Sequence, residues 1–180
     1  MPGTPSHSTV RSGVETLPDG RLRCWIEHDT LQGVTPSMLD WWFRHLEGDM
    51  DFEGQRLPRY RVWHPVDHIE VTYTQHLADG GVGVGAQLHI VEMFGGNPRH
   101  KVDALSDIVR LGEQGFGHRP QWHGLRVAAM DYRFAFDHSR AHAWILHNIE
   151  EVGQFERFLP ALFAREGGVS LKKPSVDRVQ

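Results

Sequence analysis

The sequence predicts an α+β fold in which a curved antiparallel sheet packs against a C-terminal helix. Segments with strand character outnumber helical ones, and turn signals such as Asp79-Gly80-Gly81 join them as hairpins. An apolar stripe at helical spacing occupies residues 150–165 near the end of the chain. A sheet curved around this last helix would leave a cavity between the two, which suits an apolar ligand.

The composition is that of a globular protein and argues against several functional classes. Apolar residues make up 39% of the chain and charged residues 23%, and a net charge of -4 without a basic stripe argues against nucleic acid binding. The sequence has no apolar run that would span a membrane and no signal-peptide core at its start. Its one cysteine, Cys24, permits no internal disulfide and suits the reducing cytoplasm, where we expect the protein.

The chain is predicted to form one domain. Residues 1–14 are small and polar, and we expect a flexible arm. A single domain is expected over residues 15–166, because 180 residues suit one domain and neither a repeat nor a linker divides them. Residues 167–180 are polar again and are expected to be a flexible tail.

The first elements follow from capping and turn chemistry. Residues 22–28 are expected to form either a short strand or an irregular segment that leads into the first helix. Thr35 is a good N-cap and Pro36 fits a first helical position, which predicts an amphipathic helix over residues 36–47. The acidic segment 48–57 is expected to be a loop.

A pair of histidines, His64 and His68, lies within a segment that we expect to contain a helical turn, residues 59–70. Positions four apart share a face of a helix, so both imidazoles could bind one metal ion. The same spacing also arises by chance in a chain with 13 histidines, and the alternative is a helix start with two surface or half-buried histidines.

A carboxylate stands at an inward position of a predicted strand. Residues 71–75 and 82–94 have strand character, and Glu92 continues the apolar face of the second. An unpaired buried charge is costly, so Glu92 needs a metal, an arginine or solvent as its partner. The alternative is a strand end where the sheet meets water.

Three further segments are predicted from the middle of the chain. A short helix is expected over residues 102–111, a glycine-bearing loop over 112–121 and another strand over 125–136. A turn at residues 137–139 then leads into a returning strand.

That returning strand is expected over residues 140–147 and ends at His147. The final helix covers residues 150–165, and Pro160 is expected to kink or split it.

The best candidate for chemistry is a set of three histidines and a glutamate. Three imidazoles and a carboxylate form a credible shell for zinc, or for another divalent metal, since ligand type alone does not select the ion. The set consists of His64, His68, Glu92 and His147. A serine-hydrolase elbow and the His-x-His pattern of cupins are both absent from the sequence.

Three acidic residues near this set are candidates for orienting a ligand imidazole. They are Asp67, Glu150 and Glu151. For the two glutamates, the alternative is that they are ordinary solvated charges.

Several stretches together resemble the 2,4-diacetylphloroglucinol hydrolase family. They are Gly33-Val-Thr-Pro-Ser-Met-Leu-Asp-Trp-Trp-Phe, Tyr60-Arg-Val-Trp-His-Pro-Val-Asp-His, His89-Ile-Val-Glu and His147-Asn-Ile-Glu-Glu-Val-Gly-Gln-Phe-Glu-Arg-Phe-Leu-Pro. The resemblance implies a helix-grip, START-like fold and a zinc-dependent hydrolase that cleaves the carbon–carbon bond between an acyl group and a phenolic ring. It places the zinc on His64, His68, Glu92 and His147. Asp67 departs from the family pattern, in which an amide side chain is expected.

The resulting hypothesis is a metal-dependent hydrolase of aromatic or polyketide-like substrates, in which the metal acts as a Lewis acid. Asp67, Tyr60 and Tyr132 are the candidates for proton transfer. One alternative is a non-catalytic helix-grip protein that binds a hydrophobic aromatic molecule. Another is a structural role in which hydrogen bonds satisfy the histidines and the chain acts through a partner. A homodimer is expected only because soluble enzymes are often dimers.

Overall fold

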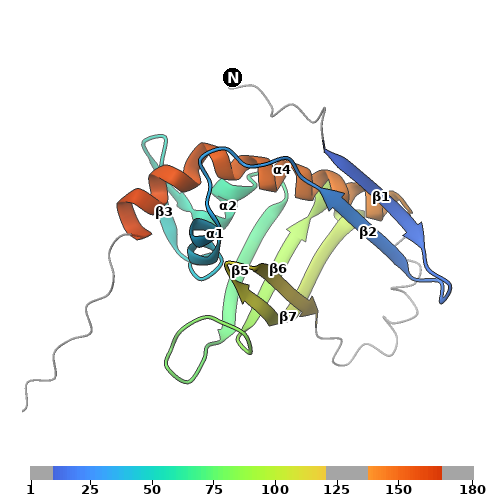
Figure 1. The fold of residues 1–180 in the computed structure, drawn as a ribbon, viewed down its shortest axis with the longest axis horizontal. Helices are drawn as coiled ribbons and strands as arrows, with labels where there is room; N and C mark the ends of the chain where they lie inside the picture. The colour runs from blue at the N-terminus through green and yellow to red at the C-terminus, as the bar shows by residue number, and fades with distance from the viewer. Residues whose placement is uncertain (1–9, 121–137, 168–180) are drawn as a thin grey trace, which may run out of the picture.

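The computed structural model describes residues 10–120 and 138–167, and its centre is a four-stranded sheet crossed by one long helix (Figure 1). Within these residues the sheet is antiparallel throughout, in the order β5-β6-β7-β8. The elements are β5 (His68–Gln75), β6 (Gln87–Met93), β7 (Lys101–Gly112), β8 (Gly115–Pro120) and helix α4 (His138–Leu162). The predicted α+β class, with an antiparallel sheet and a C-terminal helix, is therefore confirmed.

Smaller elements surround this centre. They are β1 (Arg11–Thr16), β2 (Leu22–Glu27), α1 (Pro36–Trp42), β3 (Asp49–Phe52), β4 (Gln55–Pro58), α2 (Arg59–Trp63), the 3₁₀ turns Phe94–Gly96 and Pro98–His100, and the π-helical turn Phe163–Gly167. The β1–β2 hairpin runs alongside α4, whereas α1, α2 and β3 lie toward the other end of that helix (Figure 1). None of the helices in the described part of the chain is long and apolar enough to cross a bilayer.

The predicted N-terminal arm is too long, because residues 11–14 belong to strand β1. Each of them pairs with β2, for example Val14 with Cys24. The turn between the strands places Gly20 at φ +81°, a conformation that glycine adopts without a Cβ penalty. The polar composition that suggested an arm instead reflects a hairpin that is exposed at most of its positions.

The prediction of a helix over residues 102–111 is wrong, and so is that of a loop over 112–121. Strand β7 covers the first segment and β8 most of the second, joined at Gly112–Gly115. Ser106 and Ile108 are the two buried residues of β7 and lie two positions apart, as residues on one face of a strand do. Because β7 pairs with β6 on one side and β8 on the other, its full hydrogen-bond ladder outweighs local helical propensity.

The predicted strand over 140–147 is also wrong, as is the predicted turn at residues 138 and 139, because α4 covers residues from His138 onward. Residue 137, the first of that turn, lies outside the described residues. Ala141 and Ile145 are buried and lie four residues apart, which is the spacing of one helix face. Over the short segment 140–147, the same apolar residues also match the two-residue period of a strand, which explains the wrong prediction. The helix predicted over residues 150–165 is confirmed, and it continues through Pro160 without splitting. The strand predicted over residues 125–136 lies outside the described residues.

Three other boundaries differ from the predictions. Helix α1 ends at Trp42, where the carbonyl of Leu39 accepts the N–H of Phe43. The expected loop over 48–57 is the β3–β4 hairpin, whose turn holds Glu53 and Gly54 at positive φ. The strand expected from residue 82 begins only at Gln87.

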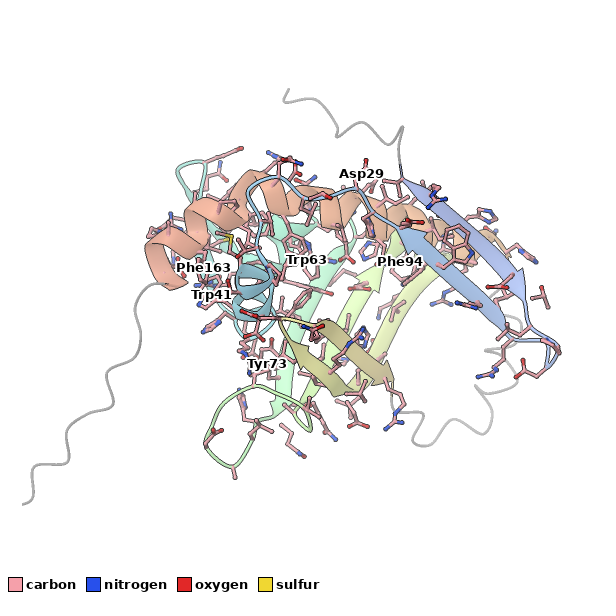
Figure 2. The ribbon with its side chains drawn as sticks, viewed as in Figure 1. Asp29, Trp41, Trp63, Tyr73, Phe94 and Phe163 are labelled. Atoms are coloured by element: carbon pink, nitrogen blue, oxygen red, sulfur yellow. The ribbon has the colours of Figure 1, made fainter. Side chains whose placement is uncertain are left out.

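The core lies between α4 and the sheet and is rich in aromatic rings. Trp42 is fully buried and contacts three rings, with centroid distances of 4.9 Å to Phe158, 5.9 Å to Trp63 and 6.2 Å to Phe155. Trp63 and Phe94 lie between the sheet and α4 (Figure 2). This packing holds α2, the start of β5 and the middle of α4 close together, which positions the candidate site.

Candidate metal centre and cavity

The two histidines of the His-x-x-x-His pair bracket a single turn, in which the backbone N–H of His68 donates to the carbonyl oxygen of His64 at 3.1 Å. The predicted turn is therefore present, but it is not part of a regular helix. Helix α2 ends at Trp63, and His64 follows it in an extended conformation with φ -141° and ψ 96°. His68 is the first residue of β5. The two imidazole rings lie close together, with their centroids 5.5 Å apart, because residues 65–67 form a turn between them.

His147 joins this pair from α4. Its ring centroid lies 4.9 Å from that of His64 and 5.2 Å from that of His68. We predicted His147 on a strand, but it lies on helix α4, which brings its ring next to those of His64 and His68. The three histidines are buried, with His68 only 1% exposed.

Asp67 fixes the orientation of His147. One carboxylate oxygen, Oδ2, accepts the Nδ1–H of His147 at 2.9 Å and the backbone N–H of Gly95 at 3.0 Å. The other oxygen accepts the N–H of Gly96 at 3.1 Å. Burial alone would raise the pKa of Asp67, but the bonds from His147 and Gly95 bring it below its ordinary value. With Nδ1 donating, the neutral form of His147 has its lone pair on Nε2.

His68 presents a free lone pair in the same way. Its Nδ1 lies 2.8 Å from the carbonyl oxygen of Tyr60 and donates to it. Its Nε2 is buried and has no hydrogen-bond partner among the described residues. Burial lowers the pKa of His68 to about 3, so the ring is neutral near neutral pH. A buried, unpartnered acceptor is costly and therefore indicates that a further group belongs at this position.

Two carboxylates face these two Nε2 atoms. Nε2 of His68 lies 3.5 Å from Oε1 of Glu92 and 3.4 Å from Oε2 of Glu151. Nε2 of His147 lies 3.9 Å from Oε2 of Glu92 and 3.6 Å from Oε2 of Glu151. Ligands at zinc distances of roughly 2.0–2.2 Å in a tetrahedron are separated by about 3.3–3.6 Å, so most of these separations suit one shared ion.

Glu92 lies where the sequence predicted it, inward on β6, directly across the ladder from His68. The hydroxyl of Tyr60 donates to Oε1 of Glu92. Burial raises the pKa of Glu92. Burial also raises the pKa of Tyr60 well above its ordinary value, and the negative charge of Glu92 raises it further. Tyr60 is therefore a neutral hydroxyl held against this carboxylate.

Glu151 is the residue that sequence reasoning undervalued. It lies four residues after His147 on α4, so both face the same direction. Burial raises the pKa of Glu151 to about 7. With the amide of Asn148 turned toward it, the Asn148 nitrogen donates to Oε1 of Glu151 at 3.3 Å. A His-x-x-x-Glu pattern was visible in the sequence but would have been informative only if a helix had been predicted there.

His64 stands beside this group. Its Nδ1 accepts the backbone N–H of Asp67 at 3.1 Å, and its Nε2 lies 3.1 Å from the exposed carboxylate of Glu150. His64, Asp67 and His147 form one set of metal-capable atoms, and His68, His147 and Glu151 form a second. Tyr132, the remaining predicted site residue, lies outside the described residues.

The acidic residues exceed the cations within the buried group. Asp67, Glu92 and Glu151 contribute three carboxylates, whereas His68 is neutral. Burial raises the pKa of Glu92 and Glu151 because it penalises the charged carboxylate. The donor set of imidazole nitrogens and carboxylate oxygens therefore suits a divalent metal such as zinc.

A cavity of about 630 Å³ adjoins the group. Tyr60, Glu92, His147 and Glu151 form part of its wall, and strands of the sheet and α4 supply most of the rest. The volume falls within the range of small-molecule sites, roughly 300–1,000 Å³.

The family model described as "DAPG hydrolase PhiG domain" matches residues 3–104, which is more than half of the chain. The chain belongs to the DAPG hydrolase family. This confirms the resemblance seen in the sequence and places the chain in a family of hydrolases. Among curated proteins and among solved structures, no match to this chain is found.

The family match covers His64, His68 and Glu92 but ends before α4. Helix α4, which carries His147 and Glu151, thus lies outside the matched residues, and the geometry of the fold brings these two side chains to the other candidates.

Proposed function

We propose that this protein is a zinc-dependent hydrolase with a helix-grip fold that cleaves the carbon–carbon bond between an acyl group and a phenolic or polyketide-like ring. The observation that carries the proposal is the buried, unpartnered Nε2 of His68, which faces Glu92 and Glu151. It adjoins a cavity large enough for an aromatic substrate. Membership of the DAPG hydrolase family supports the reaction class.

His68, His147, Glu92 and Glu151 would hold the ion, and Asp67 keeps the lone pair of His147 directed at it. His64 would join them if its Nε2 exchanged Glu150 for the metal. When bound, zinc would supply Lewis-acid polarisation of the acyl carbonyl or a ring oxygen.

Tyr60 is the best placed proton donor. Hydrolysis adds the hydroxyl of a water to the acyl carbon and a proton to the ring carbon that leaves. The Tyr60 hydroxyl lines the cavity, is kept protonated by its raised pKa and bonds to Glu92. Asp67, also predicted as a proton-transfer group, accepts three N–H bonds and instead acts as a positioning residue.

The test is to purify the protein without a histidine tag, measure its metal by mass spectrometry, and incubate it with 2,4-diacetylphloroglucinol. We expect about one zinc per chain, consistent with one tetrahedral set of ligands, and release of acetate. Tyr60→Phe should lower kcat by roughly 100-fold or more, a typical effect of losing a proton donor.

Tyr73→Phe is the matched control for this test. Tyr73 is also a buried tyrosine, but its hydroxyl donates to the carbonyl of Phe43 at 2.7 Å and does not line the cavity. Its kcat should remain close to that of the unmodified protein. A protein that folds well but takes up no added zinc would contradict the proposal and favour the alternative, a non-catalytic binding protein that uses the cavity alone.

Zinc affinity should rise with pH between about 6 and 8. Glu151, with a pKa of about 7 without metal, holds a proton below that pH and must release it to become a ligand. Affinity should therefore fall by up to about tenfold per pH unit below 7 and level off above 8. Calorimetry in buffers of different ionisation enthalpy would count the released proton. Glu151→Gln should bind zinc more weakly and lose this proton, whereas an unchanged proton count in that variant would exclude Glu151 as its source.

A further inference from the structure

One buried polar group at the cavity has no role in the metal centre. Ser106 lies on β7, is fully buried and lines the cavity. Its hydroxyl has no hydrogen-bond partner among the residues that the structure describes. Buried hydroxyls are normally paired, so this one is available to a ligand.

The sheet register places Ser106 far from the metal centre. Ser106 pairs with Leu88, whereas Glu92 pairs with Val102, so four residues separate the two positions along each strand. At a rise of about 3.3 Å per residue, the separation is roughly 13 Å. Ser106 and the metal-capable group therefore lie well apart along the same cavity.

Between these two positions the cavity is lined by the apolar pair Ile90 and Ala104, and also by the charged Asp103. Side chains at the level of Ser106 and beyond include Leu88 together with Phe43 and Phe116, which stack with their centroids 4.2 Å apart. The other end is polar, with Tyr60 and Asn148 beside the carboxylates. A hydroxylated ring would therefore lie at the polar end, with its acyl chain extending along the apolar section.

A second polar group, the exposed side chain of His118, lies near Ser106 on the next strand. His118 on β8 pairs with Ile108, two residues along β7 from Ser106, and also lines the cavity. Its ring stacks on Phe116 and forms no hydrogen bond with the other described residues. A neutral imidazole can either donate or accept a hydrogen bond, as can a serine hydroxyl.

We propose that Ser106, assisted by His118, forms a specificity site that binds a hydroxyl or carbonyl group at the far end of the substrate's acyl chain. The inference rests on the proposed function for the identity of the ring. It implies that the acyl group removed is long and ends in a hydrogen-bonding group. A short acetyl group would leave the distal site without a partner.

Two synthetic ligands of matched size test this site. One is phloroglucinol carrying an ω-hydroxyoctanoyl chain, and the other carries a nonanoyl chain, which replaces the terminal hydroxyl by a methyl group. Trp63 and Trp144 line the cavity, so the initial quenching of tryptophan fluorescence reports binding. Release of phloroglucinol is followed separately in the same samples, which keeps binding distinct from hydrolysis.

Ser106→Ala should weaken binding of the hydroxyl ligand by about tenfold and leave the methyl ligand almost unaffected, because only the first loses a hydrogen bond. Ser106→Thr keeps a hydroxyl and should restore most of the difference. In Ala104→Ser/Ser106→Ala the hydroxyl moves two residues, about 7 Å, toward the metal centre. That variant should prefer an ω-hydroxybutanoyl chain instead.

Equal effects of Ser106→Ala on both ligands would overturn the inference, as would a failure of the unmodified protein to bind either ligand. Selective loss of the hydroxyl ligand supports the site. If that loss occurs in a protein that releases no phloroglucinol, the site stands and the proposed hydrolase function fails. If the protein releases phloroglucinol from both ligands and Ser106→Ala affects both equally, the proposed hydrolase function stands and the Ser106 site fails.

Discussion

Replacing His147 by alanine is expected to weaken zinc binding by more than roughly 100-fold, since residues that merely orient a ligand already contribute 10–100-fold. Nε2 of His147 lies within 4 Å of both Glu92 and Glu151, so its loss removes one donor and the partner of two carboxylates. Hydrolysis of 2,4-diacetylphloroglucinol should fall to background. Metal content measured by mass spectrometry after gel filtration, with the rate of acetate release, tests both expectations.

The matched control is His142→Ala, which removes an exposed histidine from the same helix. It should keep both metal and activity. His147→Ala also leaves the buried Asp67 without its imidazole partner, so the variant could lose metal by unfolding. Glu151→Gln preserves side-chain shape and keeps the bond between His147 and Asp67, so zinc lost in that variant reflects a lost ligand and not unfolding. Stoichiometric zinc retained at full affinity in a folded His147→Ala variant would eliminate this residue as a ligand.

Trp42→Ala is expected to have the largest effect on stability. The side chain is 0% exposed and packs against Trp63, Phe155 and Phe158. Truncating a large aromatic residue in a core costs about 3–5 kcal/mol, because burial is lost and a cavity remains. For a chain of this size, that corresponds to a fall in Tm of roughly 10 °C or more. Thermal unfolding followed by circular dichroism measures it.

Trp25→Ala provides the comparison, because Trp25 is 41% exposed on the β1–β2 hairpin. Its Tm should change by only a few degrees. Similar losses in the two variants would mean that the cluster around Trp42 does not hold α4 on the sheet. Since Trp63 precedes His64 directly and packs on Trp42, the Trp42 variant should also bind zinc more weakly at temperatures where it remains folded.

Local patterns predicted elements well where one period was unambiguous. The Thr35-Pro36 signal marks the start of α1, and the apolar stripe after residue 150 lies within α4. Residues 102–111 and 140–147 were misassigned because each window is short and mixes polar with apolar side chains. In these segments the neighbours decide the conformation: β7 is paired on both sides, whereas the first half of α4 extends a helix already favoured downstream.

The sequence alone determined the family, because local motifs carry this information. It also predicted His64, His68 and Glu92 as site residues, all of which lie within the matched range. Only the tertiary structure decided how they meet. His68 and Glu92 face each other through the β5–β6 register, and α4 brings His147 and Glu151 to the same point from more than 50 residues away in sequence. The tertiary structure also showed that Ser106 lines the cavity and that its hydroxyl has no hydrogen-bond partner among the described residues. Contacts between residues far apart in sequence depend on the packing of helix against sheet, which no local pattern encodes.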